Sequence, residues 1–127
     1  MLTIRNLSHD PFYNQAFEEY IYQTFPDDDI FFLWQNSPAV VVGSYQNICR
    51  EVHVEALRRL GIPVVRRMTG GGAVYHDLGN LNYSLITDAP DAERISMERF
   101  TLPVVNALRG LGLDAEASGR NDILVSG

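Results

Sequence analysis

The chain has 127 residues, of which 46% are hydrophobic and 20% are charged, a composition typical of one small globular domain. Its formal net charge of −6 argues against a general nucleic-acid-binding surface, because such surfaces need many cations to neutralise phosphates. The single cysteine, Cys49, excludes an internal disulfide, and no apolar run approaches the roughly 20 residues of a membrane span. We therefore expect a cytoplasmic protein that binds neither nucleic acid nor membrane.

The start of the chain predicts a strand followed by a helix. Hydrophobic residues alternate weakly over residues 1–7, and Asp10 followed by Pro11 is typical of a helix N-terminus. An Asp side chain can cap free backbone N–H groups, and proline suits the first helical turn. Four residues at helical spacing predict the face of this helix that packs in the core: Tyr13, Ala16, Phe17 and Tyr20.

Two β-rich runs follow an acidic turn at residues 27–29. They cover Ile30 to Trp34 and residues 39–43, and the turn-forming Gln-Asn-Ser-Pro between them predicts a β-hairpin. The second run is apolar without alternation, which predicts a central strand covered on both faces. The consecutive aspartates at 27–29 point in different directions, so we interpret them as a solvated loop rather than a metal site.

The middle of the chain predicts a short helix and three further strands. The helix is indicated by an apolar stripe at helical spacing, consisting of Val54, Leu57 and Leu60. Gly61 follows, where a helix commonly ends, and strands are predicted at residues 62–66 and 73–77. Residues 81–85 alternate between apolar and polar side chains. We therefore expect the apolar members of this run to face the core, namely Leu81, Tyr83 and Leu85.

The last part of the chain predicts a helix and two strands. The helical stripe consists of Met97, Phe100, Val104, Leu108 and Leu111. Pro103 interrupts it, and because an interior proline costs about 3 kcal/mol, the helix is expected to be kinked there or to begin close to it. Residues 115–118 and 122–125 read as strands on either side of Gly-Arg-Asn. The whole order favours an α+β fold with a mixed, largely antiparallel sheet flanked by helices.

The stretch from Arg66 to Gly72 joins two arginines to three consecutive glycines. Glycines in series let backbone N–H groups converge on an anion, because no Cβ blocks the close approach of a ligand. Arginine adds a planar, permanently charged donor that suits phosphate or carboxylate. Neither a Gly-Lys-Ser/Thr sequence nor a helix-opening Gly-x-Gly-x-x-Gly pattern is present, so this is not one of those two nucleotide-binding motifs. We expect the loop to bind an anion.

His76 and Asp77 stand at the end of the strand that follows the glycines. A histidine beside a carboxylate can act as a catalytic base. Adjacent residues of a strand face opposite sides, however, so a direct couple is not expected. We interpret this pair as part of a structural turn.

The sequence Arg-Arg-x-x-Gly-Gly-Gly-Ala-Val-Tyr-His-Asp-Leu-Gly-Asn at residues 66–80 resembles that of lipoate-protein ligases, within the wider group of biotin and lipoate ligases and octanoyl transferases. Three further segments agree in order, at residues 10–20, 33–47 and 119–122, so the resemblance covers nearly the whole chain. It implies that residues 1–127 are the N-terminal part of a single catalytic domain with a biotin-ligase or class II synthetase-like fold. We therefore expect the fold of this chain to be incomplete.

The resemblance also implies roles for particular residues. Arg67 matches the arginine that contacts the nucleotide, and we expect it to be the catalytic cation. Nucleotide or lipoate contacts are expected from the residues that follow, namely Gly70, Gly71, Gly72, Ala73, Val74 and Tyr75. Asn121 and Asp122 are candidates for ribose or magnesium contacts, with a purely structural turn as the alternative.

The function implied by the resemblance is ATP-dependent and Mg²⁺-dependent activation of lipoate. The carboxylate attacks the α-phosphate, pyrophosphate departs, and the acyl group of lipoyl-AMP passes to a lysine of an acceptor domain, in a dehydrogenase complex or a glycine-cleavage protein. Two alternatives stay open: an octanoyl or lipoyl transferase that needs no ATP, and a binding module without turnover. Such transferases use a cysteine nucleophile, but Cys49 precedes a short predicted helix without an evident base, so we interpret it as structural.

The sequence contains no lysine, because all ten positively charged residues are arginine. Lipoate-protein ligases carry, shortly after their Asn-Asp-Ile strand, a lysine in a Lys-x-Ser-Gly segment that contacts both the acyl and phosphate groups. A compact ammonium at that place would hold the carboxylate against the α-phosphate. We therefore expect the chain alone to be inactive and to need a missing C-terminal portion or a second chain.

Overall fold

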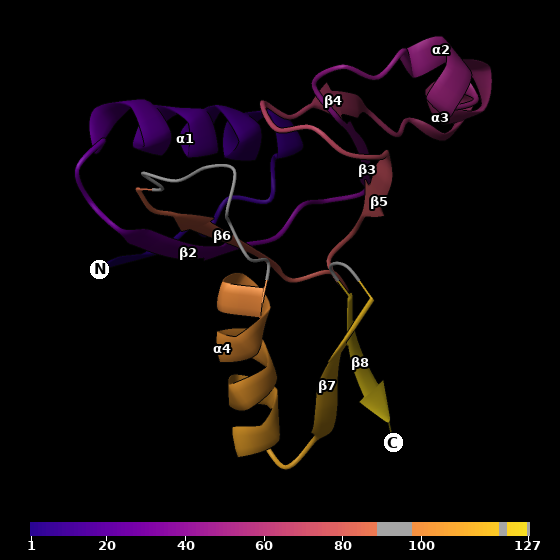
Figure 1. Ribbon diagram of the computed structural model, residues 1–127. Coiled ribbons are helices and arrows are strands. Elements are labelled where there is room, and N and C mark those ends of the chain that lie inside the picture. The colour runs from indigo at the N-terminus through magenta and orange to yellow at the C-terminus, as the bar shows by residue number, and fades with distance from the viewer. Residues whose placement is uncertain (89–97, 120–121, 127) are drawn as a thin grey trace. The chain divides into compact units, whose positions relative to one another are not determined.

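The computed structural model describes residues 1–88, 98–119 and 122–126 (Figure 1). The chain divides into two compact units, Met1–Asp88 and Ala89–Gly127. Helices and strands occur in both, which confirms the predicted α+β class. Among the described residues, no helix is both long enough and apolar enough to cross a bilayer.

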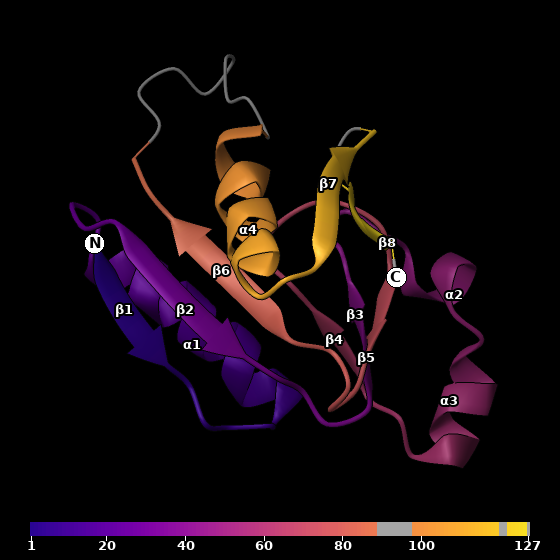
Figure 2. The same cartoon turned by 90° about the horizontal axis from the view of Figure 1, so that it is seen from below.

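The first sheet of the N-terminal unit has the strand order β1–β2–β6. Strand β1 (Leu2–Arg5) runs parallel to β2 (Ile30–Trp34), and β6 (Asn82–Ile86) runs antiparallel to β2, with Ile30 opposite Ile86 and Trp34 opposite Asn82. Helix α1 (Pro11–Thr24) lies across one face of this sheet (Figure 2). The buried cluster between them consists of Ile21, Ile30, Phe32 and Trp34.

The second sheet has the order β4–β3–β5. Strand β3 (Ala39–Val42) pairs in parallel with β4 (Val64–Arg66) and antiparallel with β5 (Val74–His76). All residues of β3 are buried, which confirms the predicted central strand. Three strand pairings of the described chain are antiparallel and two are parallel, in agreement with a mixed, largely antiparallel arrangement.

The predicted hairpin between β2 and β3 is wrong, because the two strands belong to different sheets. The segment between them is held by the start of α1 instead of turning back. The Ser37 backbone N–H donates to the His9 carbonyl at 2.8 Å, and the fully buried Asn36 side chain accepts a hydrogen bond from Asn14 at 2.8 Å. Turn chemistry in the sequence therefore marks a crossover from one sheet to the next.

The predicted buried face of α1 is also wrong in part. Tyr13 and Tyr20 are 53% and 58% exposed, and Ala16 is exposed as well. Asn14 and Ile21 are buried, and Phe17 is half-buried. Compared with the predicted orientation, the helix is rotated about its axis so that Asn14 faces the core. Its Nδ2 atom donates to the Ser8 carbonyl oxygen at 3.0 Å and to the Gln35 carbonyl oxygen at 2.8 Å. The spacing of hydrophobic residues cannot predict that a polar amide is buried, because its burial depends on hydrogen bonds to distant parts of the chain.

Strand β6 turns the opposite face to the core from the one predicted. Ser84 is buried, while Tyr83 is 40% exposed and Leu81, just before the strand, is 62% exposed. The third residue predicted to face the core, Leu85, is half-buried. The cause is the buried indole of Trp34, whose Nε1–H donates to the Ser84 hydroxyl at 3.0 Å. The Ser84 hydroxyl in turn donates to the Glu18 carboxylate at 2.5 Å, so the polar side chain is fully used inside the fold.

Short helices α2 (Ile48–Glu51) and α3 (Val54–Leu60) connect β3 to β4. Gly61 ends α3 in the left-handed conformation with φ of 67°, as predicted. The solvated interpretation of residues 27–29 also agrees with the turn seen there.

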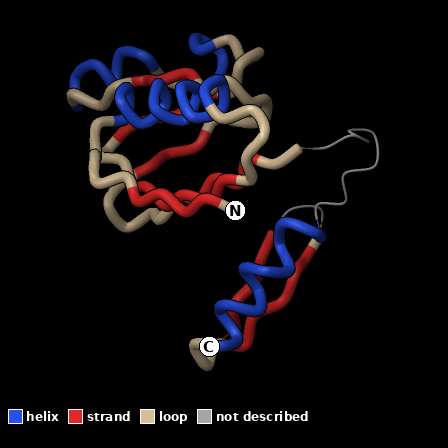
Figure 3. The backbone as a smooth tube through the Cα atoms, turned by 90° about the vertical axis from the view of Figure 1, so that its left-hand side faces the viewer, coloured by secondary structure: helices blue, strands red, loops and turns tan. Residues whose placement is uncertain are grey.

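The C-terminal unit contains helix α4 (Glu98–Gly110) and the antiparallel hairpin of β7 (Asp114–Ser118) and β8 (Asp122–Ser126), seen as a helix beside two strands in Figure 3. Pro103 lies inside α4, which begins well before it, and the predicted stripe residue Met97 lies outside the described residues. Val105 and Ala115 are buried, and the Arg109 Nε atom donates to the Ala115 carbonyl at 2.7 Å.

The N-cap of α1 provides a direct test of the local structure. The Asp10 Oδ1 atom accepts hydrogen bonds from the backbone N–H groups of Phe12 and Tyr13 at 2.8 and 3.0 Å. Asp10→Ala should lower the free energy of unfolding by about 1 kcal/mol. Asp10→Asn keeps an accepting oxygen and should be almost neutral. Urea denaturation of both variants measures this difference, and equal losses would contradict the cap assignment.

Candidate functional site

The glycine loop, defined as residues 67–73, joins β4 to β5, the two strands on either side of β3 (Figure 1). Gly70, Gly71 and Gly72 are all exposed. Gly71 has a φ of 100°, a conformation that side-chain-bearing residues rarely adopt. The sequence prediction that two strands present this loop is confirmed.

The Arg67 guanidinium holds the glycine loop from within. Its Nη2 atom donates to the carbonyl oxygens of Gly70 and Gly72, each at 2.8 Å, and its Nε atom also donates to Gly70 at 3.1 Å. Its Nη1 atom is 3.4 Å from the Val41 carbonyl oxygen on β3. Because the peptides are trans, the N–H groups of Gly71 and Ala73 point away from the carbonyl groups that the arginine holds.

Arg66 holds the neighbouring loop in the same way. Its Nη1 atom donates to the carbonyl oxygens of Gly43, Ser44 and Gln46, at 2.7, 3.2 and 2.9 Å. The two loops are also tied to each other, because the Ser44 backbone N–H donates to the Thr69 carbonyl at 2.9 Å. Both consecutive arginines therefore organise backbone, a role that sequence analysis did not assign to them.

Gly43 is a site residue that sequence analysis missed. A Cβ atom at this position would lie 2.2 Å from the Gly71 carbonyl oxygen and 3.3 Å from the Gly70 carbonyl carbon. Only glycine therefore allows the end of β3 to pack against the glycine loop. The available signal was a glycine placed directly after a buried apolar strand, where a close backbone approach is a common reason for glycine.

Gly70 and Gly72 differ from Gly43 in their surroundings. A Cβ atom at either position would meet nothing within 4 Å, and neither residue has a positive φ. Packing within the described chain does not require glycine at these two positions. The open space beside the exposed backbone is room into which a ligand can approach, and this observation fits an anion or nucleotide at the loop.

The residues after the glycines form an edge of the second sheet. Val74 and Tyr75 are 46% and 51% exposed, and Ala73 is exposed as well. His76, at the end of the same strand, is buried, with only 7% of its surface exposed. Strand β5 therefore leads from accessible side chains beside the loop to a buried imidazole.

His76 and Asp77 have separate hydrogen-bond partners, which confirms the prediction that they are not a direct couple. The Asp77 Oδ1 atom accepts from the Gly79 backbone N–H at 2.8 Å and shapes the turn. The His76 Nδ1 atom is 3.1 Å from the Asn36 Nδ2 atom. Burial lowers the pKa of His76 below its ordinary value of 6.5, and the positive charge of Arg67 acts in the same direction.

The second group of predicted site residues is only partly described. Asp122 begins β8 and pairs with Ser118, whereas Asn121 lies outside the described residues. In the described ranges, no three His, Cys, Asp or Glu side chains gather as a metal-binding group. Cys49 is exposed in α2, and its backbone N–H donates to the Asn47 side chain at 3.1 Å.

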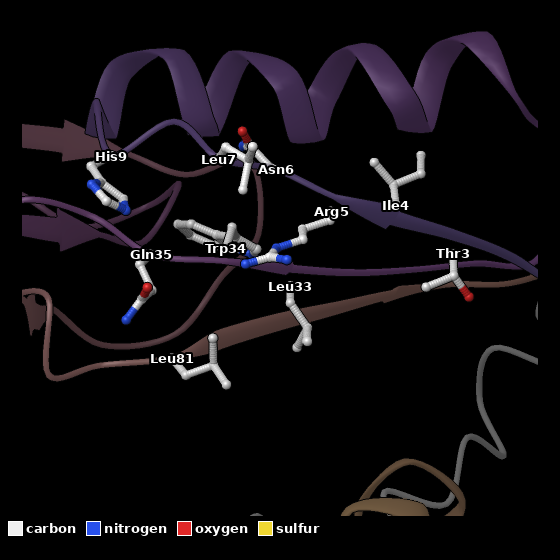
Figure 4. A pocket seen from close by; sticks show the side chains of 10 residues that line it. All are labelled: Thr3, Ile4, Arg5, Asn6, Leu7, His9, Leu33, Trp34, Gln35 and Leu81. Atoms are coloured by element: carbon white, nitrogen blue, oxygen red, sulfur yellow. The ribbon is translucent and has the colours of Figure 1, made fainter.

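A cavity of about 650 Å³ opens near the ends of β1 and β2. Its walls come from β1 and the segment that follows it, from the end of β2, and from Leu81 (Figure 4). The side chains of Arg5, Trp34 and Gln35 are among those that line it. No residue of the glycine loop lines this cavity, and the predicted site residues Gly70 to Tyr75 lie instead on an exposed loop and the start of an edge strand.

The fold and the loop define an α+β domain in which an arginine holds a glycine loop, and comparison with known proteins gives its family. The model of the lipoyl protein ligase A/B catalytic domain matches residues 10–127. The chain is 47% identical over 117 residues to lipoate-protein ligase 1 of Staphylococcus aureus and 45% identical over 129 residues to the lipoate-protein ligase LplJ of Bacillus subtilis. The chain belongs to the lipoyl protein ligase A/B catalytic domain family.

These matches cover 91% and 100% of this chain but only 36% and 39% of the two relatives. Solved structures give the same picture. LipL1 of P. falciparum in complex with lipoate has a TM-score of 0.87 at 29% identity, covering 98% of this chain and 40% of that one. The bi-partite lipoate protein ligase of Thermoplasma acidophilum, described with its E2 lipoyl domain, has a TM-score of 0.86 at 37% identity, covering 98% and 49%.

A third structure, lipoate-protein ligase A bound with ATP, has a TM-score of 0.76 at 34% identity and covers 96% of this chain and 49% of its own. The three structures therefore share the fold of this chain over almost its whole length. The chain spans between about one third and one half of the length of these proteins, from 36% to 49%.

The different surroundings of the glycines can be tested by stability measurements. Gly43→Ala should lower the free energy of unfolding by about 1–3 kcal/mol, because the new methyl group overlaps the Gly71 backbone. Gly70→Ala is the matched control and should change it by less than about 0.5 kcal/mol, because its Cβ enters open space. Urea denaturation compares the two, and a neutral Gly43→Ala variant would contradict the packing described above.

Proposed function

We propose that this chain provides the nucleotide-binding part of a lipoate-protein ligase, which activates lipoate with ATP and transfers it to a lysine of an acceptor domain. The observation that carries the proposal is the exposed glycine loop, which Arg67 holds from within while Gly70 and Gly72 leave open space on the ligand side. Membership of the lipoyl protein ligase A/B catalytic domain family supports the acyl substrate class.

The proposed reaction begins when a carboxylate oxygen of lipoate attacks the α-phosphorus of ATP and pyrophosphate leaves. Negative charge on the phosphoryl oxygens is best stabilised by donors that are already in place. The backbone N–H groups of Gly71 and Ala73 supply such donors, because each shares a trans peptide with a carbonyl that Arg67 holds, and the Arg67 charge lies on the opposite side of those peptides. Arg67 thereby acts on the transition state in two ways: it holds the loop in place, and its positive charge stabilises the negative charge on the phosphoryl oxygens.

Exposed residues beside the loop complete the proposed ligand contacts. Ala73, Val74 and Tyr75 contact the nucleotide or the apolar tail of lipoate, since their side chains are accessible at the sheet edge. Asn121 and Asp122 remain candidates for ribose or Mg²⁺. Mg²⁺ commonly binds through substrate phosphates, waters and one or two carboxylates. The exposed Asp122 fits that limited role, and Mg²⁺ would offset charge on the phosphates.

We further propose that residues 1–127 form the N-terminal part of one catalytic domain. The support is the coverage of the relatives, of which this chain matches 36% and 39%. A complementary portion or second chain then supplies the missing cationic group, since the 127 residues contain no lysine. Acceptor domains of dehydrogenase complexes or of the glycine-cleavage system are the proposed partners. A similar protein, the lipoate protein ligase of T. acidophilum, is bi-partite and was described together with an E2 lipoyl domain.

Lipoate-dependent exchange of labelled pyrophosphate into ATP tests this function. We expect little exchange with the chain alone and a rise of at least about a hundredfold when the complementary portion of a lipoate-protein ligase is added, because the missing ammonium acts on the transition state. The complementary portion alone is the control. Acyl transfer from a thioester without ATP, with no exchange under either condition, would show a transferase instead.

Gly72→Val tests whether the loop contacts the nucleotide. The added side chain fills space that the protein does not occupy, so thermal unfolding should be nearly unchanged. ATP affinity should fall by about tenfold or more, equivalent to about 1.4 kcal/mol, because a close backbone approach is blocked. Isothermal titration calorimetry measures the affinity. Equal affinities in variant and parent would refute the assignment of the glycine loop.

A further inference from the structure

Four side chains form a continuous line of hydrogen bonds from the segment before α1 to the end of β5. The Asn6 Nδ2 atom donates to Asn14 Oδ1 at 2.8 Å, and Asn14 Nδ2 donates to Asn36 Oδ1 at 2.8 Å. Asn36 Nδ2 then lies 3.1 Å from His76 Nδ1. Asn14 and Asn36 are fully buried, and His76 is 7% exposed, so water does not replace these bonds.

Backbone carbonyls determine the direction of this line. The Asn14 Nδ2 atom also lies 3.0 Å from the Ser8 carbonyl oxygen and 2.8 Å from the Gln35 carbonyl oxygen. Carbonyl oxygens only accept hydrogen bonds, so the atom that faces them must be the amide nitrogen. Asn14 therefore donates to Asn36, which must present its oxygen to Asn14 and its nitrogen to His76.

The amide orientation determines the tautomer of His76. An amide NH₂ group only donates, so Nδ1 of His76 must accept, and the ring proton of the neutral imidazole is on Nε2. Protonation of Nδ1 would place two N–H groups against each other. The lowered pKa of His76, caused by burial and then by the Arg67 charge, agrees with a neutral ring.

We propose that His76 is a neutral Nε2–H donor to an anionic oxygen of the ligand, carboxylate or phosphoryl, and that Asn36 is the positioning residue that sets its tautomer. Within the described residues, the His76 ring makes one hydrogen bond, through Nδ1, and its Nε2 atom has no protein partner. The ring is packed beside Trp34, with centroids 5.9 Å apart, which limits its rotation. The ring lies on the same strand as the exposed Val74 and Tyr75. This inference rests on the proposed function.

The arrangement excludes His76 as a general base of the usual kind. A carboxylate that orients a catalytic histidine accepts the Nδ1 proton and leaves Nε2 free to take another. Here an amide donates to Nδ1, which gives the opposite tautomer. His76 therefore holds a negatively charged oxygen in place and takes no proton from a substrate.

Nitrogen-15 NMR of the imidazole ring tests the tautomer directly. In the parent protein we expect Nδ1 in the unprotonated range and Nε2 in the protonated range near neutral pH. Asn36→Asp replaces the donor by an acceptor while still accepting from Asn14, so the ring should move its proton to Nδ1 or become charged. Circular dichroism establishes that the variant is folded.

A pair of substitutions at position 76 tests the donor without depending on Asn36→Asp. His76→Asn keeps an oxygen that can accept from Asn36 but loses the Nε2–H group, whereas His76→Gln keeps an N–H near the Nε2 position. His76→Asn should weaken binding of the ligand that meets Nε2 by roughly 10- to 100-fold, and His76→Gln should recover most of that loss. His53→Asn, at the exposed N-cap of α3, is the matched control and should change nothing.

ATP and lipoate are titrated separately by calorimetry, which shows whether the oxygen is phosphoryl or carboxylate. A selective loss for either ligand supports the proposal. A parent protein with Nδ1 protonated would overturn it even if both ligands bind, and so would equal affinities in the parent and in His76→Asn. If neither ligand binds while Nε2 is protonated, the tautomer assignment stands and the proposed function and ligand contact fail.

Discussion

Two adjacent arginines hold the backbone on which the candidate site depends. Arg66 is the last residue of β4 and Arg67 is the first of the glycine loop, and each donates to carbonyl oxygens of a different loop. Hydrogen bonds from a charged donor of this kind are stronger than those between neutral groups. The guanidinium group stays charged although its partners here are neutral backbone carbonyls. The arginine pair therefore orders two exposed loops that contain few apolar side chains to pack.

Ordering the loop by its carbonyls has a chemical consequence for the opposite side. The C=O and N–H groups of a trans peptide point in opposite directions, so a guanidinium that binds the C=O groups of Gly70 and Gly72 turns the N–H groups of Gly71 and Ala73 away from itself. Glycine serves two separate purposes here. Gly43 and Gly71 allow the backbone to pack and turn, whereas Gly70 and Gly72 leave space that the protein does not fill.

Buried amides provide the second source of order. Asn14 and Asn36 connect the start of α1 to the crossover between the two sheets of the N-terminal unit, and they continue to His76 on β5. A buried polar network is stable only when its members are satisfied, and then it permits a single arrangement of the chain. The same contacts that stabilise the crossover thus provide the hydrogen-bond partner of His76, on the strand that follows the glycine loop.

The sequence by itself determined the family, the α+β class, the glycine loop between two strands, the central position of β3, the caps at Asp10 and Gly61, and the turn at Asp77. Each of these follows from local chemistry or from a long motif. Only the tertiary structure decided the roles of Arg66 and Arg67, the need for glycine at position 43, and the separation of β2 and β3 into different sheets. It also shifted the face predicted for α1 and reversed the one predicted for β6, because Asn14 and Ser84 are buried and hydrogen-bonded. Periodicity ranks residues by hydropathy, whereas burial of a polar group depends on partners that lie far away in the sequence.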